Sequence, residues 1–448
     1  MLQTGAVEQR RHAAHEHAVE LQLRGEPFTA KCEPDEQLHM RRLCCLWLQR
    51  LALAGWSLIA SADLSLQDDL TSWFFAYQHP IDQPEVRPQA QQIAMEDPME
   101  YVAVSMAGQN TLQLINGDQK LQRMLRKAVG THGQSEQVLL TGDYEVRIKG
   151  KPWEPMSFGA FEEGMKGRRI LLDVFTSFHS LQYEFVGTVN LESTADTIFF
   201  QKVPDCEKTK FGMLSLNSKD RIRLIDLPED ACENVRLSVE ANWPKGVQST
   251  DQFVEFNAVE YKLRGTPWCC RGEQMTEARM LMTRILAGLL SKGWAVQCSL
   301  DVSRDDDDKS VFVMRNVDAQ LDDHMCLAPM GVNTVQLLDA PAETLDAVRS
   351  TVKQLLKSNI EREKSLAVHD ALHSHEWVVR GSPWNPANKE DGVMARHVIA
   401  VFLAVLRRKG WHVVTSADIS AMYERSKPVD VHALFLRRVQ HDGNGTQD

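Results

Sequence analysis

Four arginines recur along the chain at a fixed distance from an aromatic residue, and their chemistry suits the binding of anions. Each arginine lies 15 residues before the aromatic side chain, and seven residues after the aromatic stands an aspartate or, once, an asparagine. A guanidinium group could bind a phosphate or carboxylate ligand, or it could pair with the recurring aspartate. The arginines are Arg41, Arg168, Arg279 and Arg396, and the polar residues are Asp63, Asn190, Asp301 and Asp418.

The same residues have a structural interpretation, which we favour. An arginine can donate to backbone carbonyls and cover a sheet edge with its apolar stem. The copy that keeps Arg168 has Asn190 in place of aspartate, so a required Arg–Asp pair is not supported there. The arginines and aspartates of the other three copies stay candidate binding residues.

Three of the aspartates lie in the pattern Ser-x-Asp-x-Ser, at 61–65, 299–303 and 416–420. This pattern could supply metal ligands, or a nucleophile with its acid. No histidine recurs in register with it, which weakens any Ser-His-Asp arrangement. Ser and Asp side chains also close turns onto their own backbone, and we favour a turn at the end of a strand.

A second recurring string reads Arg/Lys-Gly-x-Pro-aromatic, and its aromatic residue could contact a ligand beside the turn. Proline cannot donate to a strand ladder and holds its predecessor extended. We therefore favour a strand exit whose aromatic residue covers the core, while keeping Trp268 and Trp384 as candidate binding residues. The four aromatic residues are Phe28, Trp153, Trp268 and Trp384.

Histidine clusters and an acidic run complete the possible sites. His369 and His373 are four residues apart, as zinc ligands on one helix face can be, but no third ligand stands at an expected spacing. We interpret both clusters as solvated linkers and the acidic run 305–308 as a solvated loop, because it lacks the spacing of a calcium loop. We expect no metal and no cofactor. The clusters are His12, His15 and His17, then His369, His373 and His375.

The two recurring strings show that the chain is a tandem repeat. The glycines of the Gly-x-Pro step are separated by 125, 115 and 116 residues, a period typical of duplicated modules. The sequence predicts flexible ends at 1–18 and 441–448. Between them we expect repeat 1 at 19–141, a divergent repeat 2 at 142–254, repeat 3 at 255–369 and a truncated repeat 4 at 370–440.

Each repeat contains the elements that must position these residues. A short alternating run such as 259–263 predicts a strand. It is followed by a helix with apolar residues at i, i+3, i+4 and i+7, as at 275–290. A strand begins after the helix at Trp294, and two more strands and a second helix follow. We therefore predict a mixed α/β protein of the α+β class, with about 3.5 copies of a β-α-β-β-β-α module. Each module is expected to be a single sheet with helices on one face.

Composition narrows the function classes. The net charge is −11, with 61 acidic against 50 basic residues, which argues against general nucleic-acid binding and anionic membrane surfaces. No apolar stretch is long enough for a transmembrane helix, and the N-terminal residues lack the apolar core of a secretory signal. Nine cysteines without a CxxC pair indicate buried free thiols. We expect a cytoplasmic protein, with a nuclear location left open.

The function expected from these observations is a non-enzymatic scaffold that binds proteins, because similar modules multiply contact surfaces. The alternative is a binder or enzyme for a small anionic ligand, held at a cleft between modules by the recurring Arg and Asp residues. A third hypothesis is self-association. Repeat 4 lacks its last strand and second helix, so its sheet is expected to offer an open edge to a partner strand.

Overall fold

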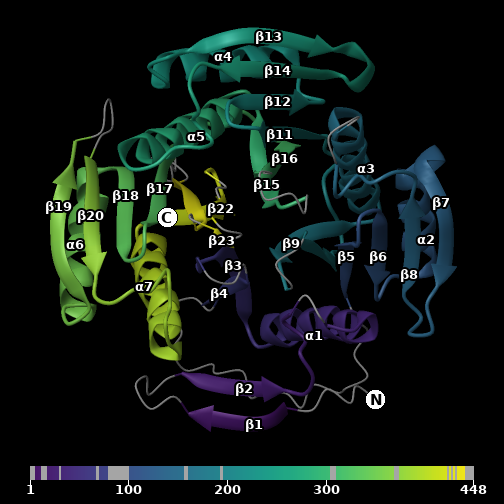
Figure 1. Ribbon diagram of the computed structural model, residues 1–448, viewed down its shortest axis with the longest axis horizontal. Coiled ribbons are helices and arrows are strands. Elements are labelled where there is room, and N and C mark those ends of the chain that lie inside the picture. Colours follow the sequence, from purple (N-terminus) through teal and green to yellow (C-terminus); the bar gives the residue numbers. More distant parts are fainter. Residues whose placement is uncertain are drawn as a thin grey trace, which may run out of the picture. The chain divides into compact units, whose positions relative to one another are not determined.

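The molecule is a mixed α+β protein whose largest elements are three six-stranded antiparallel sheets (Figure 1), which confirms the predicted fold class and its repetition. Within the described residues the sheets are accompanied by helices and by three two-stranded sheets. The computed structural model describes residues 6–11, 18–29, 32–66, 70–78, 100–155, 160–191, 195–302, 309–367, 373–420, 423–424, 427–428 and 431–438.

The chain forms two compact units that exchange short segments. The first unit contains residues 1–61, 69–208 and 300–305, and the second contains 62–68, 209–299 and 306–448. The segments 62–68 and 300–305 each include one of the recurring aspartates. These two aspartates therefore belong to a different compact unit from most of the repeat that carries them.

The first six-stranded sheet, here called the first module with its helices, belongs to the first compact unit. Its strand order is β7-β8-β6-β5-β10-β9, and α2 and α3 pack against each other beside it. The elements are β5 (Tyr101–Ala107), β6 (Thr111–Ile115), α2 (Gln119–Val129), the 3-10 turn η1 (Gly130–His132), β7 (Gly133–Val138), β8 (Tyr144–Ile148), α3 (Ala160–Ser180), β9 (Tyr183–Val189) and β10 (Thr197–Lys202).

The second module repeats this arrangement in the second compact unit. Its strand order is β13-β14-β12-β11-β16-β15, and α4 packs on α5. The elements are β11 (Phe211–Asn217), β12 (Arg221–Ile225), α4 (Glu229–Asn242), β13 (Val247–Phe253), the 3-10 turn η2 (Val254–Phe256), β14 (Ala258–Leu263), α5 (Glu273–Ser291), β15 (Trp294–Leu300) and β16 (Val311–Asn316).

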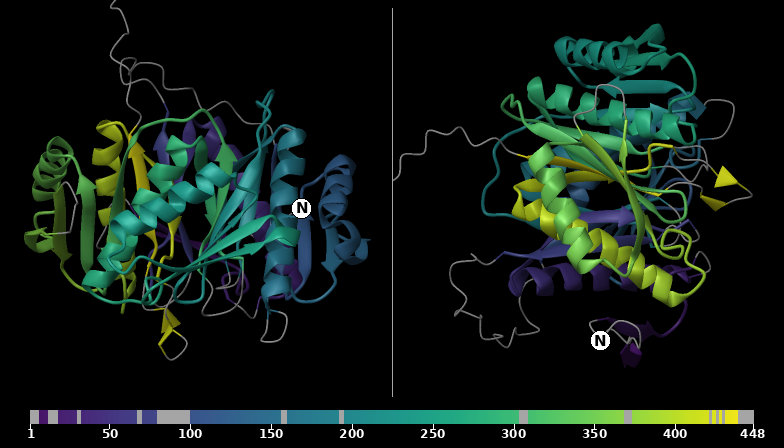
Figure 2. Two further views of the ribbon diagram at one scale, coloured as in Figure 1. Left: turned by 90° about the horizontal axis from the view of Figure 1, so that it is seen from above. Right: turned by 90° about the vertical axis from the view of Figure 1, so that its left-hand side faces the viewer.

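The third module, also in the second compact unit, has the strand order β19-β20-β18-β17-β24-β21. Figure 2 shows its helices α6 and α7 lying against the sheet, where they contact β18, β20 and β21. The elements are β17 (Asp323–Met330), β18 (Thr334–Ala340), α6 (Ala342–Leu355), β19 (Ile360–Leu366), β20 (His373–Val379), α7 (Lys389–Arg408), β21 (Trp411–Ala417), β24 (Ala433–Arg438), and the short pair β22 (Tyr423–Glu424) and β23 (Lys427–Pro428).

The N-terminal part of the chain contributes two hairpins and one long helix. Helix α1 packs on β5 and β6 of the first module, and its apolar side chains Leu38, Cys44 and Cys45 share a core with Ile115 and Phe199. Burial therefore fixes α1 against a sheet made from a later part of the chain. The elements are β1 (Ala6–Arg11), β2 (Val19–Leu23), α1 (Pro34–Leu53), β3 (Trp56–Asp63) and β4 (Thr71–Tyr77).

Each sheet combines strands from two successive sequence repeats. The first sheet takes β5, β6 and β7 from before residue 142, and β8, β9 and β10 from after it. The strands β20, β21 and β24 of repeat 4 likewise complete a sheet with β17, β18 and β19 of repeat 3. The expected unfinished edge of repeat 4 is therefore not found. The reason is that a sequence period defines the length of a repeat but not the point at which the folded module starts.

Two strands in each of the first three repeats were not predicted. One is the buried strand represented by β5, which lacks alternation because both of its faces are covered. The other is the outer strand represented by β7, β13 and β19, whose side chains are mostly exposed. In the first of these repeats the outer strand is β7, within 130–142. Polar composition hides such a strand, because it is an edge strand facing water.

Helix α5 illustrates how the predicted pattern is realised. The apolar stripe predicted between 275 and 290 is buried, and it runs through Met275, Ala278, Leu281, Met282, Ile285, Leu286, Leu289 and Leu290. The helix also buries Thr276 and Arg279, which face β17 and β18 of the third module. One core cluster joins α5 to its own sheet and to Cys326 and Leu338 of the next. The helix is thus buried on two sides rather than one.

The first helices of the repeats end in left-handed caps. Gly55, Gly293 and Gly410 have φ angles of +85°, +77° and +79°, a conformation that glycine adopts without a steric penalty. Repeat 2 keeps the same backbone without glycine, because Gln182 has a φ of +64°. The conformation of this cap is therefore common to all four copies, although the residue is not.

Candidate functional site

The recurring arginines of the first helices contact other groups of the protein. Their guanidinium groups contact a hydroxyl, a thioether and two backbone carbonyls of the preceding helical turn. Arg41 Nε donates to Thr197 Oγ1 at 3.1 Å, Arg168 Nη1 to the Gly164 carbonyl at 3.0 Å and Arg396 Nη1 to the Gly392 carbonyl at 2.8 Å, while Arg279 Nη1 contacts Met330 Sδ.

Arg396 is electrostatically coupled to one of the recurring aspartates, Asp63. Packing around the Arg396 guanidinium lowers its pKa, and the negative charge of Asp63 acts in the opposite direction. Arg41 and Arg168 are almost fully buried, and Arg279 is 0% exposed. Arg396, by contrast, is exposed. Burial therefore separates three of the four arginines from solvent.

The recurring Asp and Asn residues join repeats to each other through the backbone. In every case the carbonyl of this residue accepts a hydrogen bond from the amide at the start of the third strand of another repeat. The donors are Thr71, Asp196, Ser310 and His432, and the acceptors are Asn190, Asp301, Asp418 and Asp63, at N···O distances of 3.2, 3.0, 3.5 and 3.0 Å. We call these four contacts the inter-repeat clasps.

Side chains reinforce the clasps. The amide of Asp301 donates to Asp196 Oδ2 at 2.8 Å, and that of Asp418 donates to Ser310 Oγ at 3.0 Å. Asp418 Oδ1 also accepts from the Ser420 amide at 3.0 Å, as expected of a turn cap. The aspartates therefore hold neighbouring strands together, a role that the sequence spacing indicated only as a local turn.

The tryptophans of the Gly-x-Pro step are buried anchors. Trp153, Trp268 and Trp384 are each 0% exposed, whereas Phe28 of repeat 1 is 40% exposed. Each indole Nε1 donates to a backbone carbonyl of the adjoining hairpin, at 3.1 Å to Thr111, 3.0 Å to Arg221 and 2.8 Å to Thr334. Trp268 and Trp384 therefore have no surface exposed to solvent in this structure.

A recurring glutamate was missed by the sequence reading. It lies five residues before the glycine of each Gly-x-Pro step, at Glu20, Glu145, Glu260 and Glu376. The last three are buried and pair across the sheet with Gln113, Arg223 and Gln336. The sequence contains a signal that could have identified this glutamate: a charged residue recurs at the same position of an alternating apolar strand in all four copies, which is unusual.

In the first and third modules, an arginine of the helix α2 or α6 pairs with a glutamate of the edge strand β7 or β19. In the first, Arg126 lies 3.2 Å from Glu136, which also accepts from the hydroxyl of Tyr144. In the third, Arg349 and His375 each lie 3.1 Å from Glu363. The acid in each case comes from the outer strand, β7 or β19, and the arginine comes from the outer helix.

The second module lacks this acid. The strand register pairs Thr250 with Tyr261, as it pairs Glu136 with Val146 in the first module, so Thr250 occupies the position of the acid. Arg236 instead pairs with Glu233 and Glu240 on its own helix. Glu233 and Arg236 share a hydrogen bond on the surface of the helix. This bond is the main reason why the pKa of Glu233 is lowered and that of Arg236 is raised.

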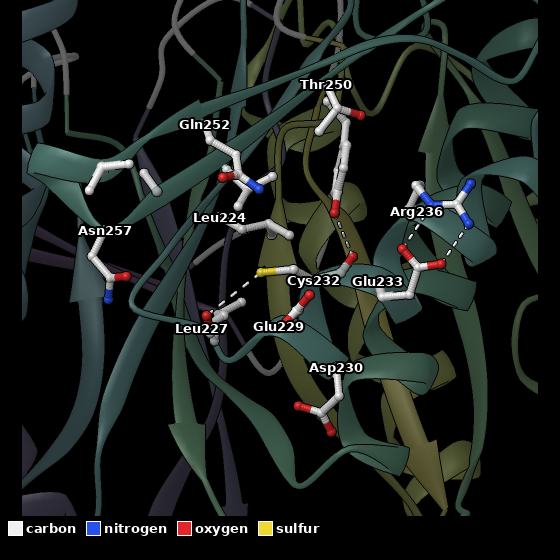
Figure 3. Close-up of a pocket in the computed structure, with 14 residues that line it drawn as sticks. Leu224, Leu227, Glu229, Asp230, Cys232, Glu233, Arg236, Thr250, Gln252 and Asn257 are labelled. Atoms are coloured by element: carbon white, nitrogen blue, oxygen red, sulfur yellow. Dashed lines mark hydrogen bonds and ion pairs between the residues drawn. The ribbon is translucent and has the colours of Figure 1, made fainter.

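A groove of about 1010 Å³ opens where the acid is missing (Figure 3). It lies between α4 and the hairpin formed by β13 and β14, and Thr250, Val259 and Arg236 all line it. None of the residues predicted as a binding site lines this groove. Its remaining lining residues include Glu229, Asp230 and Glu233 at the start of α4, and the exposed side chains of Gln252 and Val254 on the hairpin.

The floor of the groove is apolar and firmly held. Tyr261 donates its hydroxyl to the Cys232 carbonyl at 3.0 Å, and burial raises the pKa of Tyr261 to about 12. Burial likewise raises the pKa of the Cys232 thiol to about 11. A thiol with so high a pKa is protonated at neutral pH and is a poor nucleophile. Tyr261 and Cys232 are thus held in the floor of the groove by burial and by the hydrogen bond between them.

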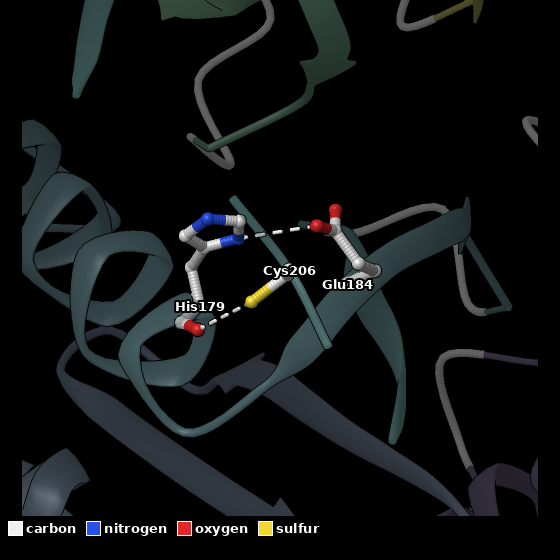
Figure 4. A group of neighbouring side chains, drawn as sticks. All are labelled: His179, Glu184 and Cys206. Carbon is white, nitrogen blue, oxygen red and sulfur yellow. Dashed lines mark hydrogen bonds and ion pairs between the residues drawn. The ribbon is translucent and has the colours of Figure 1, made fainter. Parts of the chain in front are cut away.

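One group of side chains in the first compact unit has the composition of a metal site (Figure 4). His179, Glu184 and Cys206 place one ligand atom each within 4.8 Å of the others. They come from the last turn of α3, the start of β9 and the segment after β10. The sequence reading did not predict this group, because its members follow no motif spacing.

The predicted histidine clusters have different outcomes. His12, His15, His17, His369 and the acidic run 305–308 lie outside the described residues. His375 does not lie in a solvated linker: it is buried in strand β20, with its ring 4.6 Å from that of Trp377. Burial lowers the pKa of His375, against the opposing effect of Glu363.

Two other expectations concern the cysteines and the membrane. All nine cysteines are free, and most are buried, as predicted. None of the helices in the described part of the chain is long and apolar enough to cross a membrane.

The comparisons with known proteins agree with the repeat. The model of a single domain family matches the chain four times, at residues 2–76, 100–201, 210–315 and 323–437. The last three matches coincide with the three six-stranded modules. No curated protein and no solved structure matches the chain.

Proposed function

The chain belongs to this domain family, and we propose that it is a non-enzymatic interaction scaffold that binds a basic protein segment in the groove of the second module. The observation that carries this proposal is the loss of one carboxylate. Glu136 and Glu363 occupy the outer face of the other two modules, whereas Thr250 leaves that place open. The second module keeps the fold of the others and has a groove at this position, which is suited to binding a partner protein.

The shape and charge of the groove define the partner. Three acidic side chains, Glu229, Asp230 and Glu233, line it against the single base Arg236. This excess of negative charge favours a basic segment and disfavours an anion. The apolar floor and the exposed Val254 offer burial for an apolar side chain of the same segment.

The small-ligand alternative finds less support. It requires recurring arginines that face a cleft, but Arg168 and Arg396 donate to backbone carbonyls of their own helices. The aspartates serve in the inter-repeat clasps through their backbone. The recurring residues therefore build a framework, and the differences between modules provide the binding surface.

The test fills the groove without disturbing the fold. Thr250→Glu restores the acid of the other modules, places it within reach of Arg236 and occupies the groove. Ser249→Glu adds the same charge one residue earlier, where the side chain points to the opposite face of β13. The full chain and both variants are immobilised at equal density and exposed to extract from native cells, and the retained proteins are identified.

We expect one or more proteins to be retained by the unchanged chain and by Ser249→Glu, and to be lost with Thr250→Glu. A synthetic peptide from such a protein should bind at least about tenfold more weakly to Thr250→Glu, because the buried contact is lost. Equal retention by all three proteins, or a retained partner that binds through an acidic segment, would contradict the proposal.

A further inference from the structure

The His179, Glu184 and Cys206 group is arranged as metal ligands are. His179 Nδ1 lies 3.3 Å from Glu184 Oε1, and Cys206 Sγ lies 3.1 Å from the His179 carbonyl oxygen. Figure 4 shows the Glu184 carboxylate beside a ring nitrogen of His179 and the Cys206 sulfur beside the main-chain oxygen of the same residue. His179 is buried, whereas Glu184 and Cys206 are half-buried, so an ion could enter from solvent.

The hydrogen bond on the far side of the ring fixes the orientation of His179. Its Nε2 lies 2.7 Å from the Glu207 carbonyl oxygen, which can only accept. In the neutral ring Nε2 therefore carries the hydrogen, and the lone pair of Nδ1 points at the Glu184 carboxylate. Two acceptors at 3.3 Å repel each other unless a positive charge lies with them. A backbone carbonyl behind the ring is the usual support of a metal-binding histidine.

The group is specific to repeat 2. Counting from the left-handed cap, His179 and Glu184 correspond to Leu290 and Ala295 in repeat 3, and neither side chain could bind a metal. The framework therefore forms without these ligands. Their presence together in the most divergent repeat calls for a role beyond packing.

We propose that His179 Nδ1, Glu184 and Cys206 Sγ bind one divalent zinc-type cation, with water in the fourth position. Nitrogen and sulfur ligands favour zinc over calcium or magnesium. Tetrahedral bonds of about 2.0–2.3 Å place ligand atoms roughly 3.3–3.8 Å apart. The separation of His179 from Glu184 already fits, and rotation of the half-buried Cys206 side chain brings the sulfur within reach.

Binding would attach the segment after β10 to the end of α3. The chain passes from the first compact unit to the second between Lys208 and Thr209, so Cys206 lies next to one of the crossings between the units. The ion therefore orders the residues that lead into the second unit. This role is independent of the groove in the second module.

The test uses cobalt as a spectroscopic substitute for zinc in the full chain. A cobalt–thiolate bond gives a charge-transfer absorption that carboxylate or histidine ligands alone do not give. The variants are Cys206→Ser, which removes the sulfur, and Cys269→Ser, which removes another half-buried thiol outside the group. Burial raises the pKa of other thiols, such as Cys44 to about 12, so these contribute little background.

We expect one cobalt ion per chain, a thiolate band that zinc displaces, and loss of the band in Cys206→Ser with at least a tenfold weaker affinity. Cys269→Ser should retain both the band and the affinity, and Glu184→Gln should weaken binding. Circular dichroism checks that each variant is folded. Absence of the band in the unchanged chain, its survival in Cys206→Ser, or its loss in Cys269→Ser would overturn the proposal. If the unchanged chain gives no band, the positive charge between His179 and Glu184 is a proton and not a metal ion.

Discussion

The anchoring tryptophan of the second module provides a quantitative test of how the repeat is held together. Trp268 is 0% exposed, and its indole Nε1 donates to the Arg221 carbonyl at 3.0 Å. Its backbone amide donates to the Lys219 carbonyl, also at 3.0 Å. The side chain therefore joins the segment after β14 to the hairpin between β11 and β12.

The structure sets the size of the expected effect. Replacement of a fully buried Trp by Ala costs about 3–5 kcal/mol, because apolar burial is lost and a cavity remains. Trp268→Phe keeps most of the volume but leaves the Arg221 carbonyl without its indole donor, which costs about 1–2 kcal/mol. Phe28→Ala is the matched control, because the aromatic residue of repeat 1 is 40% exposed. It should cost about 1 kcal/mol or less.

The assay must follow the second compact unit separately, since two units need not unfold together. Guanidinium unfolding gives the free energy change, and amide hydrogen exchange in peptides from 209–299 locates it. Trp268→Ala should lower protection throughout these peptides, with Trp268→Phe intermediate. If Trp268→Ala and Phe28→Ala cost the same, or if Trp268→Ala costs less than about 1 kcal/mol, the anchoring role is refuted.

Three further predictions follow from individual contacts. Glu260→Gln should cost about 3–5 kcal/mol in denaturant unfolding, because it leaves a buried arginine without its carboxylate, whereas Glu233→Gln on the surface should change stability little. Gln182→Gly should raise stability by about 0.5–1 kcal/mol, since it relieves a positive φ; a loss of stability would contradict this. Burial lowers the pKa of His324 and His375, so the unfolded state binds more protons in acid. Unfolding free energy should be highest above about pH 6.5 and fall below it, and an increase on acidification would exclude this cause.

The sequence determined the local elements well, because their causes are local. The glycines of the Gly-x-Pro step all have positive φ angles, and the apolar stripe of α5 is buried as its spacing predicts. The outer strand β13 escaped prediction, since a polar edge strand is formed by pairing with β14 and not by its own composition.

The candidate sites were harder to predict, because the spacing of residues in the sequence does not show which distant residues become neighbours in the fold. Arg279 was a plausible ligand-binding residue until α5 was seen to be buried on two sides. In the groove, Thr250 takes the place of the acid found in the other modules. This difference is recognised only when equivalent positions of the modules are matched by their strand pairing. Cys206 approaches His179 only because the chain after β10 returns to the end of α3.

The sequence by itself determined that the chain is a repeat, the length of its period, and most helices and strands. These follow from short-range patterns of apolar residues, glycine and proline. Only the tertiary structure decided where each module begins, because a period has no inherent starting point and strand pairing sets it. Tertiary structure also decided which groups the recurring Arg and Asp residues contact. Their partners, such as Thr197 for Arg41 and Ser310 for Asp418, are brought close by folding alone.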